Sequence, residues 1–194
     1  MVCCAAGKGH DKRLEIAASL AGRFDARVIG IAARAEFVPL YYDGRSYSAG
    51  AVEAGERAAI ESHLRDAEER FCAALHGIAR KVDWRSAAES PLSFIARKCR
   101  AADFLIAGNN FDDPLLDPCD LIMLAGRPIL MIPDAVRELK AEQILIAWKD
   151  TREARRAIFD ALPLLRLCKK AVVAEADEPH DPKYSGCRME DVVG

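Results

Sequence analysis

The chain has 194 residues, of which 51% are hydrophobic and 30% are charged, a composition typical of folded globular proteins. Its formal net charge of −2 gives no support to nucleic acid as a partner, which usually needs a basic face, nor to an anionic membrane surface. The N-terminal apolar run is too short for a signal peptide, and no stretch approaches the ~18 apolar residues of a spanning helix. We therefore expect a cytoplasmic protein that binds neither nucleic acid nor membrane.

The first predicted elements are a strand, a helix and a second strand. Residues 1–6 and 28–33 are short apolar runs that suit buried strands. Between them, apolar residues recur at helical spacing, at Leu14, Ala17, Ala18, Ala21 and Phe24. A strand–helix–strand unit with short connections normally forms a parallel pair with a right-handed crossover.

A long amphipathic helix is predicted over 53–80, after an irregular segment at 34–51 that contains proline and glycine. Its predicted apolar face consists of Ile60, Leu64, Ala67, Phe71, Ala74 and Ile78. The opposite face carries many charges of both signs, which indicates a solvent-exposed helix surface with local ion pairs.

The alternation of strands and helices continues to residue 132. The further predicted elements are a strand at 82–86, a helix from Pro91, a strand at 103–108, a short helix at 121–124 that ends at Gly126, and a fifth strand at 128–132. Five strands that alternate with helices predict an α/β fold, a doubly wound, Rossmann-like sheet of five parallel strands.

The same pattern restarts after a polar linker at 134–142. Residues 144–148 predict a strand, and Asp150 and Thr151 begin a helix. The apolar positions of this helix repeat those of the first helix at a constant offset of 144, and Val172 repeats Val28 at the same offset. We therefore predict a complete domain at 1–133, the linker, and a truncated second copy at 143–194, with a disordered tail from 177.

Three segments carry a family resemblance: AADFLIAG at 101–108, GRPILMIP at 126–133 and ILIAWKDTREARRA at 144–157. In this order they resemble the universal stress protein family in its tandem bacterial form. The resemblance implies a five-stranded sheet like that of adenine-nucleotide-binding proteins and a cytoplasmic protein linked to stress resistance in bacteria. It also implies that two chains pair through the last strand. Some members bind ATP and others do not.

Most residues that would hold ATP in the binding members are replaced here. Those members have an aspartate at the end of the first strand, followed by a small-residue turn, and the pattern G-x-x-G-x9-G-[ST] after the fourth strand. The corresponding positions are occupied by Ala5, Ala6, Gly108, Phe111, Leu121 and Ile122, so only the first glycine of the pattern is kept. Glycines matter at such a site because they let backbone N–H groups approach phosphates closely.

The segment after the fourth strand carries four aspartates where the ATP-binding members have residues that contact phosphate. They are Asp112, Asp113, Asp117 and Asp120, and carboxylates beside a triphosphate repel it unless a cation intervenes. The sequence therefore predicts no bound cofactor. A nucleotide site is kept as an alternative, near Ala5, Ala6, Gly108, Asn109 and Gly126.

Cysteines and histidines give no sign of a metal centre or a disulfide framework. The chain has seven cysteines, an odd number without a C-x-x-C pair, and four histidines without metal-ligand spacing. We expect reduced thiols that pack as small apolar residues. A redox or metal module built on the cysteines is the weakest alternative.

The sequence thus predicts a non-enzymatic stress-response protein, without catalytic or metal-ligating residues, that acts through self-association or a protein partner of unknown identity. The predicted contact is a homodimer through the fifth strand, because residues 129–132 would form an uncovered apolar edge. The alternative function is a stress-signalling switch that binds ATP. One version of this hypothesis adds ATP hydrolysis.

Overall fold

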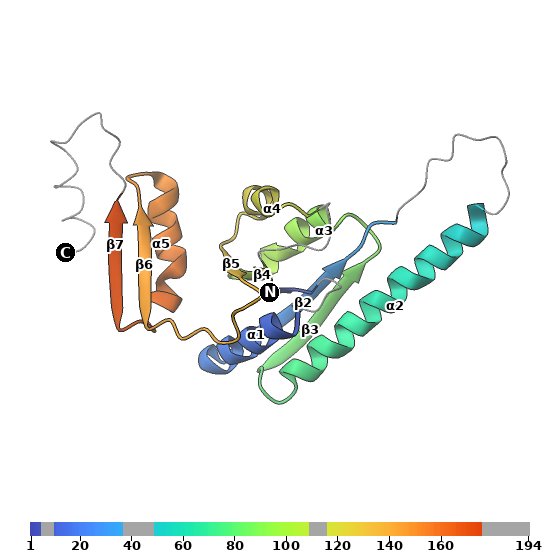
Figure 1. Cartoon of the computed structure of the whole chain (residues 1–194), viewed down its shortest axis with the longest axis horizontal. Helices are drawn as coiled ribbons and strands as arrows, with labels where there is room; N and C mark the ends of the chain where they lie inside the picture. Colours follow the sequence, from blue (N-terminus) through green and yellow to red (C-terminus); the bar gives the residue numbers. More distant parts are fainter. Residues whose placement is uncertain (5–9, 37–48, 109–115, 176–194) are drawn as a thin grey trace. The chain divides into compact units, whose positions relative to one another are not determined.

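The computed structural model describes residues 1–4, 10–36, 49–108 and 116–175, and the chain divides into two compact units at 1–139 and 140–194 (Figure 1). The first unit contains a five-stranded parallel sheet in the order β3-β2-β1-β4-β5. The predicted α/β fold with five parallel strands is therefore confirmed. The predicted disordered tail from 177 lies outside the described residues.

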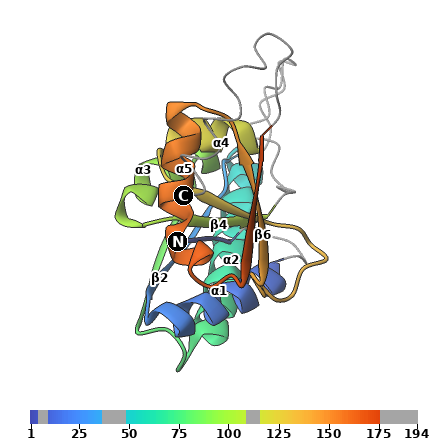
Figure 2. The same cartoon turned by 90° about the vertical axis from the view of Figure 1, so that its left-hand side faces the viewer.

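Short strands and amphipathic helices alternate through the first unit. The strands are β1 (Val2–Cys3), β2 (Arg27–Ala33), β3 (Lys81–Ala87), β4 (Leu105–Gly108) and β5 (Ile129–Ile132), and the helices are α1 (His10–Phe24), α2 (Ala49–Leu75), α3 (Pro91–Lys98, followed by one 3-10 turn at Cys99–Ala101) and α4 (Pro118–Ala125). Helices α1 and α2 cover one face of the sheet and α3 and α4 cover the other, as right-handed crossovers require (Figure 2).

Each face of the sheet buries its own apolar layer. On the α1 and α2 side, Ile16, Phe71 and Leu75 are fully buried. On the other side, one cluster joins strand residues to α3 and α4: Met1, Cys3, Ile29, Ile31, Leu105 and Ala107 with Phe94, Ile95, Cys99, Leu121 and Ala125. Burial on both faces explains why the central strands are continuous apolar runs rather than alternating ones.

Helix α2 ends earlier than the sequence predicts. It stops at Leu75, and Gly77 adopts a left-handed conformation with φ of +72° that turns the chain out of the helix. Ile78 therefore lies outside the helix and is 49% exposed, whereas Leu75 is fully buried in its place. The predicted local ion pairs are present, for example between Arg57 and Glu61 one turn apart.

The second unit contains a two-stranded parallel sheet and one helix: β6 (Gln143–Trp148), α5 (Arg152–Leu165) and β7 (Lys170–Glu175). Thr151 caps α5 by accepting a hydrogen bond from the Ala154 N–H at 3.2 Å. The strand pairing corrects one detail of the predicted repeat. Val2 pairs with Gly30, whereas Ile146, which the predicted offset of 144 matches to Val2, pairs with Val173, 143 residues after Gly30.

Val172 therefore occupies the place of Ile29 and not of Val28, because the chain between the matched helix positions and the second strand is one residue shorter. One face of the β6–β7 sheet also differs from its equivalent in the first unit. Leu145 and Val172 are 69% and 44% exposed, whereas Met1 and Ile29, at the matching positions, are 9% and 3% exposed. Helices α3 and α4 cover Met1 and Ile29, and the described part of the second unit has only α5.

Candidate functional site

The carboxyl ends of β1 and β4 meet at the middle of the first sheet. Val2 of β1 pairs with Ile106 of β4, and the chain leaves these two neighbouring strands toward opposite faces of the sheet. This is the topological switch point at which ligands bind in open α/β sheets. Of the residues predicted for a nucleotide site, Gly108 lies here, whereas Ala5, Ala6 and Asn109 are outside the described residues.

Gly126 lies at the opposite edge of the sheet from Gly108. Strand β5 begins beside Leu105, whose N–H donates to the Pro128 carbonyl at 2.9 Å, and it ends with Ile132 beside Gly108. Gly126, two residues before Pro128, is thus near the start of β4, so the structure does not bring the two glycines together. Gly126 ends α4 with φ of +57°, the left-handed conformation that glycine adopts without strain.

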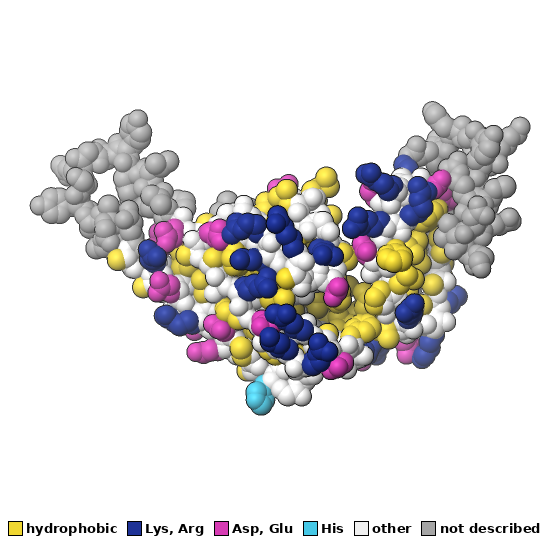
Figure 3. Space-filling model, turned by 180° about the vertical axis from the view of Figure 1, so that it is seen from behind, with side chains coloured by type: hydrophobic (Ala, Val, Ile, Leu, Met, Phe, Trp, Pro, Cys, Tyr) yellow, Lys and Arg dark blue, Asp and Glu magenta, His cyan; other side chains and the backbone are white. Residues whose placement is uncertain are grey.

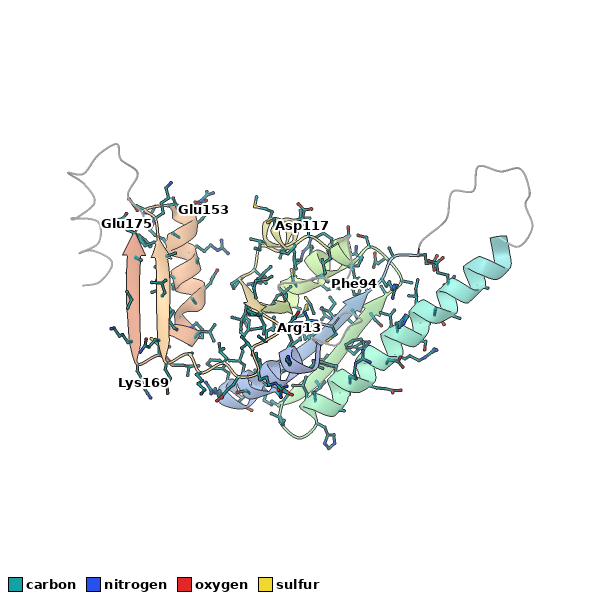
Figure 4. The ribbon with its side chains drawn as sticks, in the orientation of Figure 1. Arg13, Phe94, Asp117, Glu153, Lys169 and Glu175 are labelled. Carbon is teal, nitrogen blue, oxygen red and sulfur yellow. The ribbon has the colours of Figure 1, made fainter. Side chains whose placement is uncertain are left out.

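Arg13 is a buried cation near the switch point that sequence reasoning missed. It lies on the first part of α1 with 5% of its surface exposed (Figure 4). The helical periodicity contained a signal, because Arg13, Ala17 and Leu20 follow one stripe of α1 and all three are buried. An arginine is rarely buried without a polar role, and this one places a positive charge near Cys3 and Cys4.

The two adjacent cysteines of this region are not nucleophiles at neutral pH. Burial raises the pKa of the Cys3 thiol to about 12, and the nearby chain N-terminus and Arg13 only partly oppose this effect. Burial also raises the pKa of Cys4 to about 12. Because the thiolate is the reactive form, both groups are inert in the folded state. The six described cysteines are all free.

Two other kinds of feature are not found among the described residues. In those parts of the chain, no group of three or more His, Cys, Asp or Glu side chains is arranged to hold a metal ion. Within the same ranges, none of the helices has both the length and the apolar character needed to cross a bilayer. Asp112 and Asp113 of the acidic segment lie outside the described residues.

A second candidate site is an apolar surface formed by β5 and α4, which we call the β5–α4 edge. Strand β5 is the last strand of the sheet, and Ile129, Leu130 and Met131 are only half-buried. Along α4, three consecutive apolar side chains are exposed: Ile122 by 52%, Met123 by 81% and Leu124 by 60%. Asp117 caps the N-terminus of α4, because its side chain accepts hydrogen bonds from the N–H groups of Cys119 and Asp120 (Figure 4).

Comparison with known proteins places this architecture in a structural class. No family model matches the chain, and no curated protein is significantly similar to it in sequence. Among solved structures, a universal stress protein from Archaeoglobus fulgidus DSM 4304 matches all of this chain and 73% of its own, with a TM-score of 0.64 and 16% identity. The universal stress protein UspA from Lactobacillus plantarum matches 68% of this chain and 95% of its own, with a TM-score of 0.51 and 12% identity.

These similarities establish the fold. The protein is a doubly wound α/β protein in which the order β3-β2-β1-β4-β5 places the switch point between β1 and β4 and makes β5 an outer strand. Its fold is that of the universal stress proteins. The resemblance noted in three segments of the sequence is therefore confirmed at the level of the fold.

Proposed function

We propose that the protein is a non-enzymatic stress-response protein of the cytoplasm that acts by self-association through the β5–α4 edge. The observation that carries this proposal is the row of exposed apolar side chains on α4 beside an outer strand. Monomeric proteins rarely expose large contiguous apolar patches, and where they do the patch often marks an interaction site. An unpaired outer strand is in addition a template for another strand.

Two chains related by a two-fold axis could cover both the unpaired strand β5 and the exposed apolar side chains of α4. Antiparallel pairing of two β5 strands would join the two sheets and bring the two α4 helices together. Strand β5 has only four residues, so its backbone hydrogen bonds are few and the apolar contacts must supply most of the affinity. Neighbouring helix residues point roughly 100° apart, so about two of the three exposed α4 side chains of each copy can face the partner. Each contributes up to about 2 kcal/mol when buried, and together they are comparable with the cost of association of ~4–15 kcal/mol.

Light scattering over a concentration series tests this proposal. We expect twice the monomer mass of 21.3 kDa at micromolar concentration. Replacing Met123 or Met131 by lysine should raise the dimer dissociation constant at least about tenfold, because a charge in an apolar contact is costly to desolvate. Met123→Lys is the cleaner variant, since Met123 is 81% exposed and its change leaves the core intact.

Leu145→Lys is the matched control, because Leu145 is an apolar residue of the second unit that is also largely exposed. It should leave the dimer unchanged. A protein that stays monomeric at high micromolar concentration contradicts the proposal. A dimer that is lost only in the Leu145 variant places the contact on the β6–β7 sheet instead.

A nucleotide-dependent switch is the second candidate function, and Arg13 is the observation in its favour, because it places a cation near the switch point. The replaced glycines and added aspartates outweigh this single cation. We expect calorimetric titration with Mg-ATP to give no saturable heat up to about millimolar ligand. The binding free energy would then be weaker than about −4 kcal/mol, the value for a millimolar dissociation constant. A micromolar dissociation constant that Arg13→Met abolishes would establish the switch instead.

A further inference from the structure

Four basic side chains gather at the carboxyl end of α3, and we call them the cationic cluster: Arg85, Lys98, Arg100 and Arg127. Arg85 of β3 donates from Nη1 to the Lys98 carbonyl at 3.2 Å, and Arg127 donates from Nη2 to the Arg100 carbonyl at 3.2 Å. The two accepting carbonyls are two residues apart, so the guanidinium groups of Arg85 and Arg127 both reach the end of α3, the short segment from which the Lys98 and Arg100 side chains also extend. Figure 3 shows Lys and Arg side chains crowded on this face of the first unit.

None of the four cations forms a direct ion pair among the described residues, although Arg85 is close enough to Asp83 to contribute to the lowered pKa of that carboxyl. The neighbouring Arg97 does form an ion pair, since it pairs with Glu89 at 2.7 Å. Arg100 and Arg127 are exposed, and Arg85 and Lys98 are half-buried. Each arginine that contacts a backbone carbonyl uses one of its five N–H donors there, which leaves the others available.

The negative ends of two helices offset only part of the positive charge of the cluster. Helices α3 and α4 both end at the cluster, because the Cys99 thiol contacts the Ala125 carbonyl at 3.2 Å. Each helix end carries the equivalent of about −0.5 charge, so the two ends offset roughly one of the four cations. About three positive charges are left over, held close together by the backbone contacts of Arg85 and Arg127. Such a group of like charges attracts anions.

We propose that the cationic cluster binds the phosphodiester backbone of a nucleic acid without reading its sequence. Arginine forks match phosphate oxygens in geometry, and phosphate contacts alone supply sequence-independent affinity. The ring of Phe94 is 4% exposed and lies under Arg97 and Lys98, so the cluster has no aromatic surface on which bases could stack. Backbone contact is therefore the mode of binding that these residues fit.

Nucleic acid fits this surface better than an acidic protein segment does. Protein interfaces usually depend on a few apolar or aromatic anchors, and no large apolar side chain of β3 or α3 is exposed. The exposed apolar side chains of the adjoining α4 belong to the β5–α4 edge. The net charge of −2 conceals the cluster, because it averages over the whole chain. Between residues 80 and 100, the sequence has six Lys or Arg and only two Asp or Glu. Arg127 lies between α4 and β5, beside the β5–α4 edge. The dimer is tested by the mass of the protein alone and the cluster by added nucleic acid, so the two proposals can fail separately.

Fluorescence anisotropy with a labelled duplex of about 20 base pairs, at about 50 and about 200 mM salt, tests the proposal. We expect binding that weakens as salt rises. The variant Arg100→Glu with Arg127→Glu should lower affinity at least about tenfold and reduce the slope of log K against log salt by about 2, roughly 0.9 for each lost phosphate contact. Circular dichroism should show that the variant stays folded, since both side chains are exposed.

The matched control is Arg65→Glu with Arg70→Glu on α2, which makes the same change in net charge on the opposite side of the sheet. This control should alter affinity by less than about twofold. Equal losses in both variants would overturn the proposal, because they would reflect total charge only. Absence of binding at about 50 mM salt, or stronger binding of labelled polyglutamate than of the duplex, would overturn it as well.

Discussion

Replacing Gly30 by alanine is expected to destabilise the first unit by about 3 kcal/mol. A Cβ atom at Gly30 would lie 2.5 and 2.7 Å from two ring carbons of Trp84 and 2.8 Å from a ring carbon of Phe71. These distances are well below van der Waals contact, so the rings would have to move. They have little room, because Phe71 is fully buried and its ring centroid is 5.4 Å from that of Trp84.

Gly22→Ala provides the matched control for this substitution. Gly22 lies in α1, and the nearest atom to its added Cβ would be Cγ2 of Ile78 at an ordinary 3.7 Å. Because alanine is a better helix former than glycine, this variant should be more stable by roughly 0.5–1 kcal/mol. The same chemical change thus has opposite signs at two positions, and equal effects would contradict the packing of Gly30 described above.

Denaturant unfolding followed by tryptophan fluorescence measures both effects. The chain has two tryptophans, Trp84 in the first unit and Trp148 in the second. A Trp148→Phe background leaves Trp84 as the only reporter of the first unit. This change is mild, because the buried Trp148 N–H has no hydrogen-bond partner in the described part of the chain and phenylalanine keeps the apolar ring.

The elements of the fold could be predicted because their signals are local. The apolar stripe of α1, the proline at the start of α3 and the glycine after α4 each act within a few residues. The end of α2 was the main error, because Ile78 continues the helical spacing while Gly77 two residues after Leu75 breaks the helix. The predicted fifth strand and its half-buried apolar residues also follow from a short local run.

The candidate sites could not be predicted in the same way, because they join residues that are far apart in the chain. The contact of Gly30 with Phe71 and Trp84 joins β2, α2 and β3. Arg85 and Arg127 reach the end of α3 only once the sheet has formed. The net charge of the whole chain does not show such a local group of arginines. Gly126, which was expected near Gly108, lies at the opposite edge of the sheet.

The second large effect is expected for Phe71→Ala, which should cost the first unit about 3–5 kcal/mol. Phe71 has no exposed surface, it fills the space between α2 and the sheet, and its ring contacts that of Trp84. Its removal loses the transfer free energy of the ring and leaves a cavity. The surrounding aromatic and strand residues are held by the rest of the core, so they can fill this cavity only in part.

Phe24→Ala is the control within the same unit, because Phe24 ends α1 and is 37% exposed. Its cost should be no more than about half that of Phe71→Ala, since less apolar area is lost and water can occupy the space. Trp84 fluorescence in the Trp148→Phe background reports both midpoints, and the denaturant slope should be unchanged if each variant acts on the folded state. Equal costs would mean that α2 does not pack on the sheet through Phe71, and the steric account of Gly30 would then fail with it.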